Sequence, residues 1–157
     1  MVSGDSIPIS QLVDDVHNGI EHFVYSFNHD TQKIEPNLIV NGWVSGVANK
    51  LVVITLDNGE QIRCTPEHKF MLRDGTYRMA KNLIPNDSLM PLYTKLSNKG
   101  LNGYRLLFEP MEEEWHYEHR RFAKEVADER YLVHHKNCNK LDNSPTNLIW
   151  CSKKLHT

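Results

Sequence analysis

The stretch that decides the fold of the C-terminal third is Val133-His-His-Lys-Asn-Cys-Asn-Lys-Leu-Asp-Asn-Ser-Pro-Thr-Asn-Leu-Ile-Trp150. Its two adjacent histidines follow an apolar run that begins at Tyr131, so they end a predicted strand. A loop rich in Asn, Asp, Ser and Pro comes next, and a second strand is predicted over 148–150. Ser152 is placed to cap a helix that contains His156. This order of elements would bring His134 and His156 to one side.

Such an arrangement suits phosphodiester hydrolysis, which needs a base to deprotonate water and a cation to neutralise the scissile phosphate. Imidazole is a suitable base because its ordinary pKa of about 6.5 lies close to working pH. A neighbouring amide or carbonyl usually fixes its tautomer. Two nitrogen ligands leave most of the coordination sphere of a divalent ion open to water and phosphate oxygens.

With His135, Asn147 and His156 in this order, residues 104–157 resemble the HNH (ββα-metal) nucleases of phage-type homing endonucleases. The segment from Glu114 to Ala123 is similar to the helix that precedes the motif in that family. The resemblance implies a divalent metal, Mg²⁺ or Mn²⁺ with Zn²⁺ as the alternative, and double-stranded DNA as partner. The implied roles are general base for His135, its support for Asn147, loop fixation for Asn143, and metal ligation for His134 and His156.

Charge is unevenly distributed along the chain. Residues 1–92 hold 7 Lys and Arg against 11 Asp and Glu, whereas residues 93–157 hold 11 against 9 together with five of the nine His. A basic C-terminal part favours contact with phosphate, although a solvated surface explains it equally well. The predicted DNA contacts are Arg120, Arg121, Lys124, Lys136 and Lys140.

Two other groups of side chains are weaker candidates for metal ligation. His116 and His119 have the spacing of one helical turn, but a solvated helix face is the simpler interpretation. Cys138 and Cys151 lack further thiolates at zinc-site spacing. Cys138 also stands where the HNH family usually has Gly, and a turn residue with positive φ tolerates Cys poorly.

The first half of the chain has sequence patterns that are typical of β-structure. Asn58-Gly59 and Asp74-Gly75 each separate two β-rich runs, and such dipeptides predict hairpins. Further strands are predicted over 23–27, 38–40 and 42–44, a short helix over 10–16 with Ser10 as N-cap, and a helical turn over 79–83.

From about Tyr93 the pattern changes. The polar, glycine-containing stretch 95–103 predicts a linker. Apolar residues at helical spacing then predict a helix over 115–127, with acidic residues in its first turn. The predicted domains are therefore 1–92, a linker at 93–112, and 113–157.

Residues 1–92 resemble the N-terminal part of an intein, which has the Hint fold. The resemblance rests on the opening Val2-Ser-Gly-Asp-Ser6, on Thr65-Pro-Glu-His68 and on Leu83-Ile-Pro-Asn-Asp87. It implies that Thr65 and His68 activate the peptide bond at the N-terminal splice junction. For His68 alone, a buried hydrogen-bonded histidine in a β-barrel is the alternative. The fold class expected is thus a mostly β Hint-like domain plus a small α+β HNH domain.

Position 1 departs from the intein pattern. An acyl shift needs a thiol or hydroxyl, and Met1 has only a thioether with no proton to lose. The chain also stops at Thr157, one residue past the predicted ligand His156, and lacks a terminal His-Asn pair. We therefore expect that it does not splice alone. It is expected to be an HNH endonuclease fused to an intein domain or, alternatively, a non-catalytic intein fragment that binds a complementary C-terminal fragment.

Composition narrows the class further. The chain has 157 residues with a formal charge of −2, and 39% of them are hydrophobic, which is typical of a globular protein. No apolar run approaches the roughly 20 residues that span a bilayer, so no membrane is expected. Three cysteines without a C-x-x-C pair predict free thiols in a reducing, cytoplasmic setting.

Overall fold

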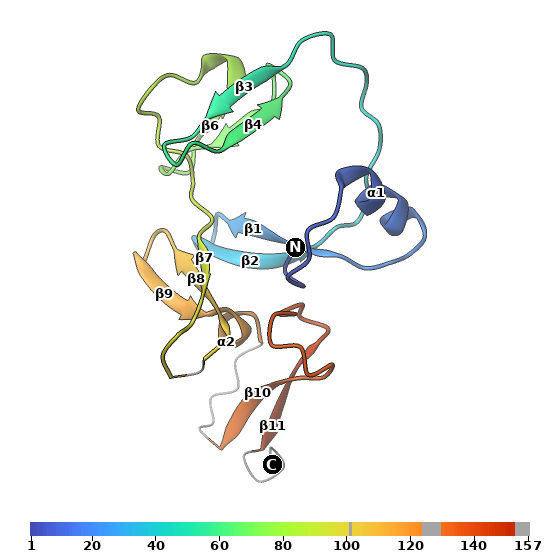
Figure 1. Cartoon of the computed structure of the whole chain (residues 1–157), viewed down its shortest axis with the longest axis vertical. Helices are drawn as coiled ribbons and strands as arrows, with labels where there is room; N and C mark the ends of the chain where they lie inside the picture. Colours follow the sequence, from blue (N-terminus) through green and yellow to red (C-terminus); the bar gives the residue numbers. More distant parts are fainter. Residues whose placement is uncertain (101, 124–129, 153–157) are drawn as a thin grey trace. The chain divides into compact units, whose positions relative to one another are not determined.

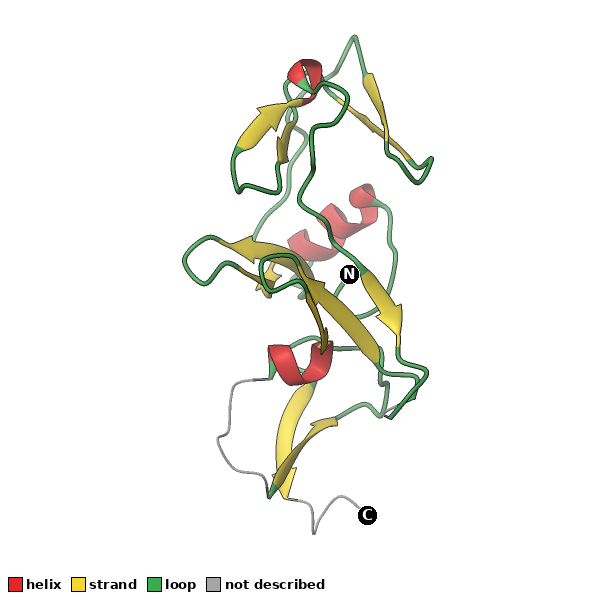
Figure 2. Ribbon diagram, turned by 90° about the vertical axis from the view of Figure 1, so that its left-hand side faces the viewer, coloured by secondary structure: helices red, strands yellow, loops and turns green. Residues whose placement is uncertain are grey.

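The fold is mostly β, as expected (Figures 1 and 2). A computed structural model describes residues 1–100, 102–123 and 130–152. The chain consists of two compact units. The first contains residues 1–43 together with 92–157, and the second contains residues 44–91. Within the described ranges, no helix has the length and apolar character of a transmembrane span. The elements, in chain order, are α1 (Ile9–His17), β1 (Phe23–Asn28), β2 (Lys33–Leu38), β3 (Val52–Thr55), β4 (Gln61–Cys64), β5 (Lys69–Met71), β6 (Tyr77–Met79), the 3₁₀ turn η1 (Ala80–Asn82), β7 (Thr94–Leu96), β8 (Arg105–Glu109), β9 (Glu114–Tyr117), α2 (Glu118–Phe122), β10 (Tyr131–His135) and β11 (Leu148–Ser152).

The first unit combines the two ends of the chain around one apolar core. Its buried members come from the N-terminus, β2, β8, the end of α2, and β11, and they are Val2, Ile34, Leu107, Phe122, Ala123 and Leu148. Side chains of the β1–β2 hairpin pack against the same cluster. Burial of this shared apolar surface holds the N-terminal hairpin to the C-terminal elements. The predicted boundary near residue 92 thus falls where the second unit ends, but residues 1–43 belong with the C-terminal elements and not with residues 44–91.

Two strands, β7 and β8, lie within residues 93–112, where a linker was predicted. β7 pairs with β8, and β8 pairs with β9, in one antiparallel three-stranded sheet. The polar, glycine-containing segment is the turn between β7 and β8, which closes with a hydrogen bond from Ser97 N to Tyr104 O at 2.8 Å. Alternation along β8 buries Leu107 and Glu109 completely on one face.

The helix predicted over 115–127 is also wrong in its first part. Residues 114–117 are β9, and α2 is confined to Glu118–Phe122. Glu113, with φ of 57°, reverses the chain so that Trp115 lies opposite Phe108, with ring centroids 5.4 Å apart. Cross-strand pairing with β8 thus outweighs the local helical pattern. The remainder of the predicted helix, 124–127, lies outside the described residues.

The two strands predicted around the histidine-rich stretch are confirmed. β10 and β11 pair antiparallel, with Val133 opposite Trp150 and His135 opposite Leu148 (Figure 1). The helix predicted after Ser152 falls outside the described residues.

The second unit contains both hairpins that the turn dipeptides predicted. β3 pairs with β4 and β5 with β6. Gly59 and Gly75 both have φ of 84°, a conformation that glycine adopts without strain. The predicted turn over 79–83 is present as η1.

The N-terminal helix and the segment after β2 differ in detail from the prediction. α1 begins at Ile9 and has Pro8 as N-cap, without a side-chain cap from Ser10. The strands predicted over 38–40 and 42–44 are wrong, because residues 39–51 form neither helix nor strand. The segment has β-rich composition, but none of the described strands pairs with it.

Candidate functional site

The β10–β11 hairpin positions His135 against Asn143. His135 ends β10 and is 4% exposed, and its Nε2 lies 2.9 Å from the side-chain oxygen of Asn143, which is fully buried. Because an amide oxygen can only accept, Nε2 is the donor in this hydrogen bond. The His135 ring is therefore oriented by Asn143 rather than by Asn147, and its neutral form would have the lone pair on Nδ1.

Asn147 instead ties the hairpin loop to itself. Its Nδ2 donates to the carbonyl oxygen of Asp142 at 2.8 Å and to the side-chain oxygen of Asn137 at 2.9 Å. Its side-chain oxygen accepts from Asn137 N at 3.1 Å. The resemblance implied that Asn147 holds the base and Asn143 fixes the loop, and the geometry of the two asparagines is the reverse. Cys138, in the same loop, has φ of 60°, the conformation in which the family's Gly would be unstrained.

A second buried histidine lies beside His135. His119, in α2, is 3% exposed, and its ring centroid is 5.6 Å from that of His135 and 4.7 Å from that of Tyr104. Burial, aided by neighbouring His135 and Arg120, lowers the pKa of His119 to about 4. Its Nδ1 has no hydrogen-bond partner among the described residues. His119 is thus a neutral ring that packs His135 in place, and it does not line a solvated helix face with His116.

Next to the histidines lies a buried polar network. Glu118 is fully buried, and its Oε1 accepts a hydrogen bond from the Tyr25 hydroxyl at 2.8 Å. Arg105 donates to the same hydroxyl at 3.1 Å and lies 3.8 Å from Glu118 Oε2. Burial raises the pKa of Glu118, while the Tyr25 hydrogen bond and the Arg105 charge oppose that rise. Burial, reinforced by the Glu118 charge, raises the pKa of Tyr25. The network joins β1, β8 and α2.

The N-terminus of the chain reaches the same hairpin. Val2 is fully buried, its N–H donates to Phe23 O at 3.1 Å, and its carbonyl accepts from Asn143 N at 3.2 Å. Met1, the predicted splicing position, donates from its amino group to Asp5 O at 2.9 Å. The backbone of residue 2 therefore helps to place the asparagine that holds His135.

The predicted metal ligands are described only in part. His134 lies on β10 opposite Ile149 and is partly buried, whereas His156 lies outside the described residues. Within the described ranges, no three His, Cys, Asp or Glu side chains are grouped as a metal site would require. Of the two predicted ligands, the described residues therefore supply only His134. Cys138 and Cys151 form no disulfide, and the Cys151 thiol donates to Leu132 O at 3.6 Å.

The predicted DNA contacts differ in their surroundings. Arg120 is exposed, with its guanidinium carbon 5.3 Å from the ring centroid of Tyr117. Arg121 donates to Glu109 at 3.3 Å and to Glu112 at 2.9 Å, so its charge is already neutralised within the protein.

Two exposed lysines lie on the hairpin loop. Lys136 donates to Thr146 O at 2.7 Å, and the Lys140 ammonium lies 5.1 Å from the ring centroid of Tyr104, next to His135. Lys124 lies outside the described residues. Of the predicted DNA contacts that the structure describes, Arg120, Lys136 and Lys140 are thus the exposed ones.

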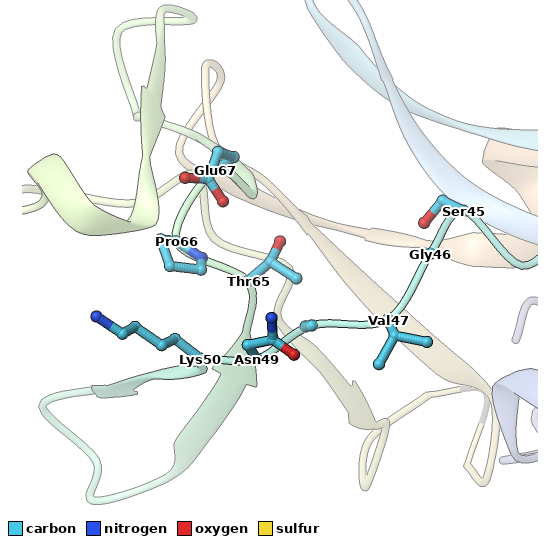
Figure 3. A pocket seen from close by; sticks show the side chains of 9 residues that line it. Ser45, Gly46, Val47, Asn49, Lys50, Thr65, Pro66 and Glu67 are labelled. Atoms are coloured by element: carbon cyan, nitrogen blue, oxygen red, sulfur yellow. The ribbon is translucent and has the colours of Figure 1, made fainter.

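The predicted splicing residues of the second unit follow β4. Thr65 and His68 are both exposed, and His68 N donates to Thr65 O at 3.1 Å, closing a turn. The alternative of a buried barrel histidine is therefore wrong. The His68 ring packs edge-on against Phe70, with centroids 5.0 Å apart. A pocket of about 500 Å³ adjoins the turn (Figure 3), and its lining residues are Ser45, Gly46, Val47, Ala48, Asn49, Lys50, Thr65, Pro66 and Glu67.

Sequence reasoning missed two buried carboxylates, Glu109 and Glu118, and the burial of His119. Glu109 accepts from Ile34 N at 3.1 Å and from Arg121. The burial of Glu109 could have been predicted from a strand at 105–109, because Glu109 lies two residues after Leu107 and therefore on the same face of β8. The sequence around Glu118 predicts neither its burial nor its hydrogen-bond partner, since Tyr25 is 93 residues away in the chain.

Comparison with known proteins identifies the family. Residues 2–149 match the model of the intein splicing domain, so the chain belongs to the intein splicing domain family. The chain is 38% identical over 168 residues to the B subunit of DNA gyrase from Synechocystis sp.. The alignment covers 99% of this chain and 16% of that relative. No solved structure matches. A protein-splicing domain is therefore the class that the sequence and the mostly β fold define.

Proposed function

We propose that the chain is an intein splicing domain that carries an HNH DNA endonuclease around His135. The observation that supports the nuclease most strongly is the hydrogen bond between His135 Nε2 and the Asn143 side-chain oxygen, 2.9 Å long. If the imidazole is neutral, this bond leaves the lone pair on Nδ1, and an unprotonated ring nitrogen is what a general base requires. The antiparallel pair β10–β11 is the expected setting for the motif.

The proposed reaction is hydrolysis of a DNA phosphodiester. His135 Nδ1 takes a proton from water as the water oxygen bonds to phosphorus, and the bond from phosphorus to the leaving oxygen breaks. We also propose a divalent cation held by His134 and His156, which would neutralise charge on the phosphate. Because His135 is 4% exposed and the Tyr104 ring lies 5.8 Å from it, we propose that Tyr104 moves when substrate enters.

Incubation with supercoiled plasmid tests the nuclease. Nicked or linear product is expected with Mg²⁺, Mn²⁺ or Zn²⁺ and not with EDTA. His135→Ala is expected to lower the rate about 10²- to 10⁴-fold, the usual contribution of a positioned base. His17→Ala, an exposed histidine at the end of α1, is the matched control and should leave the rate unchanged. Equal cleavage by wild type and His135→Ala would contradict the assignment.

For splicing, we propose that Thr65 and His68 activate the junction bond that precedes residue 1. Met1 has no proton to lose, so an acyl shift there requires a thiol or hydroxyl. In Met1→Cys, fused behind a short peptide, the thiol would attack the preceding carbonyl and the displaced amine would take up a proton. Dithiothreitol is then expected to release the peptide. Release should fail with Met1 or when His68→Ala is added, and equal release from all three would contradict the proposal.

A second candidate is a non-catalytic fragment that binds a complementary C-terminal intein segment in the cytoplasm. It is favoured by apolar side chains in the second unit that stay exposed, namely Val44 (89%), Val47 (93%) and Leu51 (60%). Mixing the chain with such a segment separates the candidates. A stable complex without any nicking of plasmid would support this second function, and metal-dependent nicking without a partner would support the first.

A further inference from the structure

One face of the β7–β8–β9 sheet carries an aromatic surface. We call it the ring face and define it by Tyr93, Lys95, Phe108, Trp115 and Tyr117. Phe108 and Trp115 are cross-strand partners, and the Tyr93 ring centroid lies 6.0 Å from that of Phe108. Tyr93 is 56% exposed and Trp115 is 38% exposed. Aromatic rings of this size are usually buried further, so the face presents apolar area to a partner.

Two cationic side chains contact the ring face. Lys95 Nζ lies 3.7 Å from the Trp115 ring centroid, and the Arg120 guanidinium carbon lies 5.3 Å from that of Tyr117. Because side chains alternate along a strand, Glu114 and His116 lie on the opposite face of β9, where they are 4.0 Å apart. Glu109 is buried on that opposite side as well. Exposed rings next to cations, with the carboxylates of the sheet turned away, favour an anionic polymer with stackable groups.

The ring face leads toward His135. Tyr117 lies on the same strand face as Trp115, two residues further along β9. Its ring centroid is 5.8 Å from that of His119, which in turn is 5.6 Å from that of His135. The ring face is therefore connected to the proposed base through the buried ring of His119.

We propose that the ring face binds a single DNA strand. Its bases stack on Tyr93 and on Trp115, from which the Lys95 ammonium moves away, and Lys95 and Arg120 contact its phosphates. Only unpaired nucleotides offer the faces of their bases to an aromatic side chain, so the occupant is single-stranded rather than duplex. The inference rests on the proposed function for the choice of DNA. It adds that the strand is unpaired where it crosses the sheet.

Binding of fluorescein-labelled oligo(dT) of 20 nucleotides, followed by anisotropy in EDTA, tests the proposal without cleavage. Trp115→Ala is expected to weaken binding about 5- to 100-fold, the usual effect of removing one stacking ring. Trp115→Phe keeps a ring and should stay within about threefold of wild type. Trp43→Ala is the matched control, because Trp43 is 71% exposed and lies outside this sheet. Lys95→Gln should lower the slope of log affinity against log salt by about 0.7.

Three results would overturn the proposal. The first is that the wild-type chain does not bind oligo(dT), and the second is that Trp115→Ala and Trp43→Ala bind it with equal affinity. The third is that a duplex of equal length binds as tightly as oligo(dT) and that Trp115→Ala weakens its binding as much. Failure of the wild-type chain to bind oligo(dT) would instead favour a protein as the partner of this face. Retained binding in Trp115→Phe shows that loss in Trp115→Ala is not misfolding. If the chain binds oligo(dT) through Trp115 but cuts no plasmid, the nuclease proposal is refuted and the ring-face proposal is supported. If the chain cuts plasmid but its binding does not depend on Trp115, the ring-face proposal is refuted and the nuclease proposal is supported.

Discussion

Replacement of Asn143 by Ala removes the acceptor that holds His135. Asn143 is fully buried and His135 is 4% exposed, so water cannot readily replace the lost partner of Nε2. An unsatisfied buried donor costs about 1–3 kcal/mol. For a chain of this length, each kcal/mol shifts the melting temperature by about 2–4 °C, which gives an expected loss of about 2–12 °C.

Urea and thermal unfolding followed by circular dichroism measure this loss. Asn139→Ala is the matched control in the same loop, because Asn139 is exposed and its side-chain oxygen accepts from Leu141 N at 3.0 Å. Its cost is expected to stay below about 0.5 kcal/mol, the usual range at the surface. The reasoning is refuted if Asn143→Ala unfolds within about 0.3 kcal/mol of wild type, the error of such comparisons, or if Asn139→Ala costs more.

Three further predictions concern the same unit. The pKa of His119 is lowered from 6.5 to about 4, so the unfolded chain binds more protons than the folded one between these pH values. The free energy of unfolding is therefore expected to fall by up to about 3 kcal/mol as the pH falls from 7 to 4. Urea unfolding across this range should show a smaller fall for His119→Phe, and equal falls for the two chains would contradict the burial argument. Tyr25→Phe leaves Glu118 Oε1 without its donor and should cost about 1–3 kcal/mol in urea unfolding, with a loss below about 0.5 kcal/mol counting against the network. Cys138→Gly relieves a φ of 60° and should raise the free energy of unfolding by up to about 1 kcal/mol, whereas a loss would show that the Cys conformation is unstrained.

Local signals were enough to predict the hairpins. The turns at Gly59 and Gly75 and the β10–β11 pair each depend on residues within a short stretch of chain. The mostly β character follows from the same turns. The approximate place of His135, at the end of a strand beside an asparagine-rich loop, was also predicted.

What the sequence did not show depends on contacts between distant segments. β8 and β9 were taken for linker and helix because only their mutual pairing makes them strands. The role of Asn143, rather than Asn147, in holding His135 follows from how the loop folds back, which spacing alone does not specify. The bond from Asn143 N to Val2 O joins the two ends of the sequence.

The nuclease proposal depends on one proton: the one on His135 Nε2. Long-range ¹H–¹⁵N correlation spectra of the histidine side chains at neutral pH report which ring nitrogen carries it. For His135 we predict the Nε2–H tautomer, with an unprotonated Nδ1, and loss of this single form in Asn143→Ala. A proton on Nδ1 in the wild-type chain, or a spectrum unchanged by Asn143→Ala, would contradict the account.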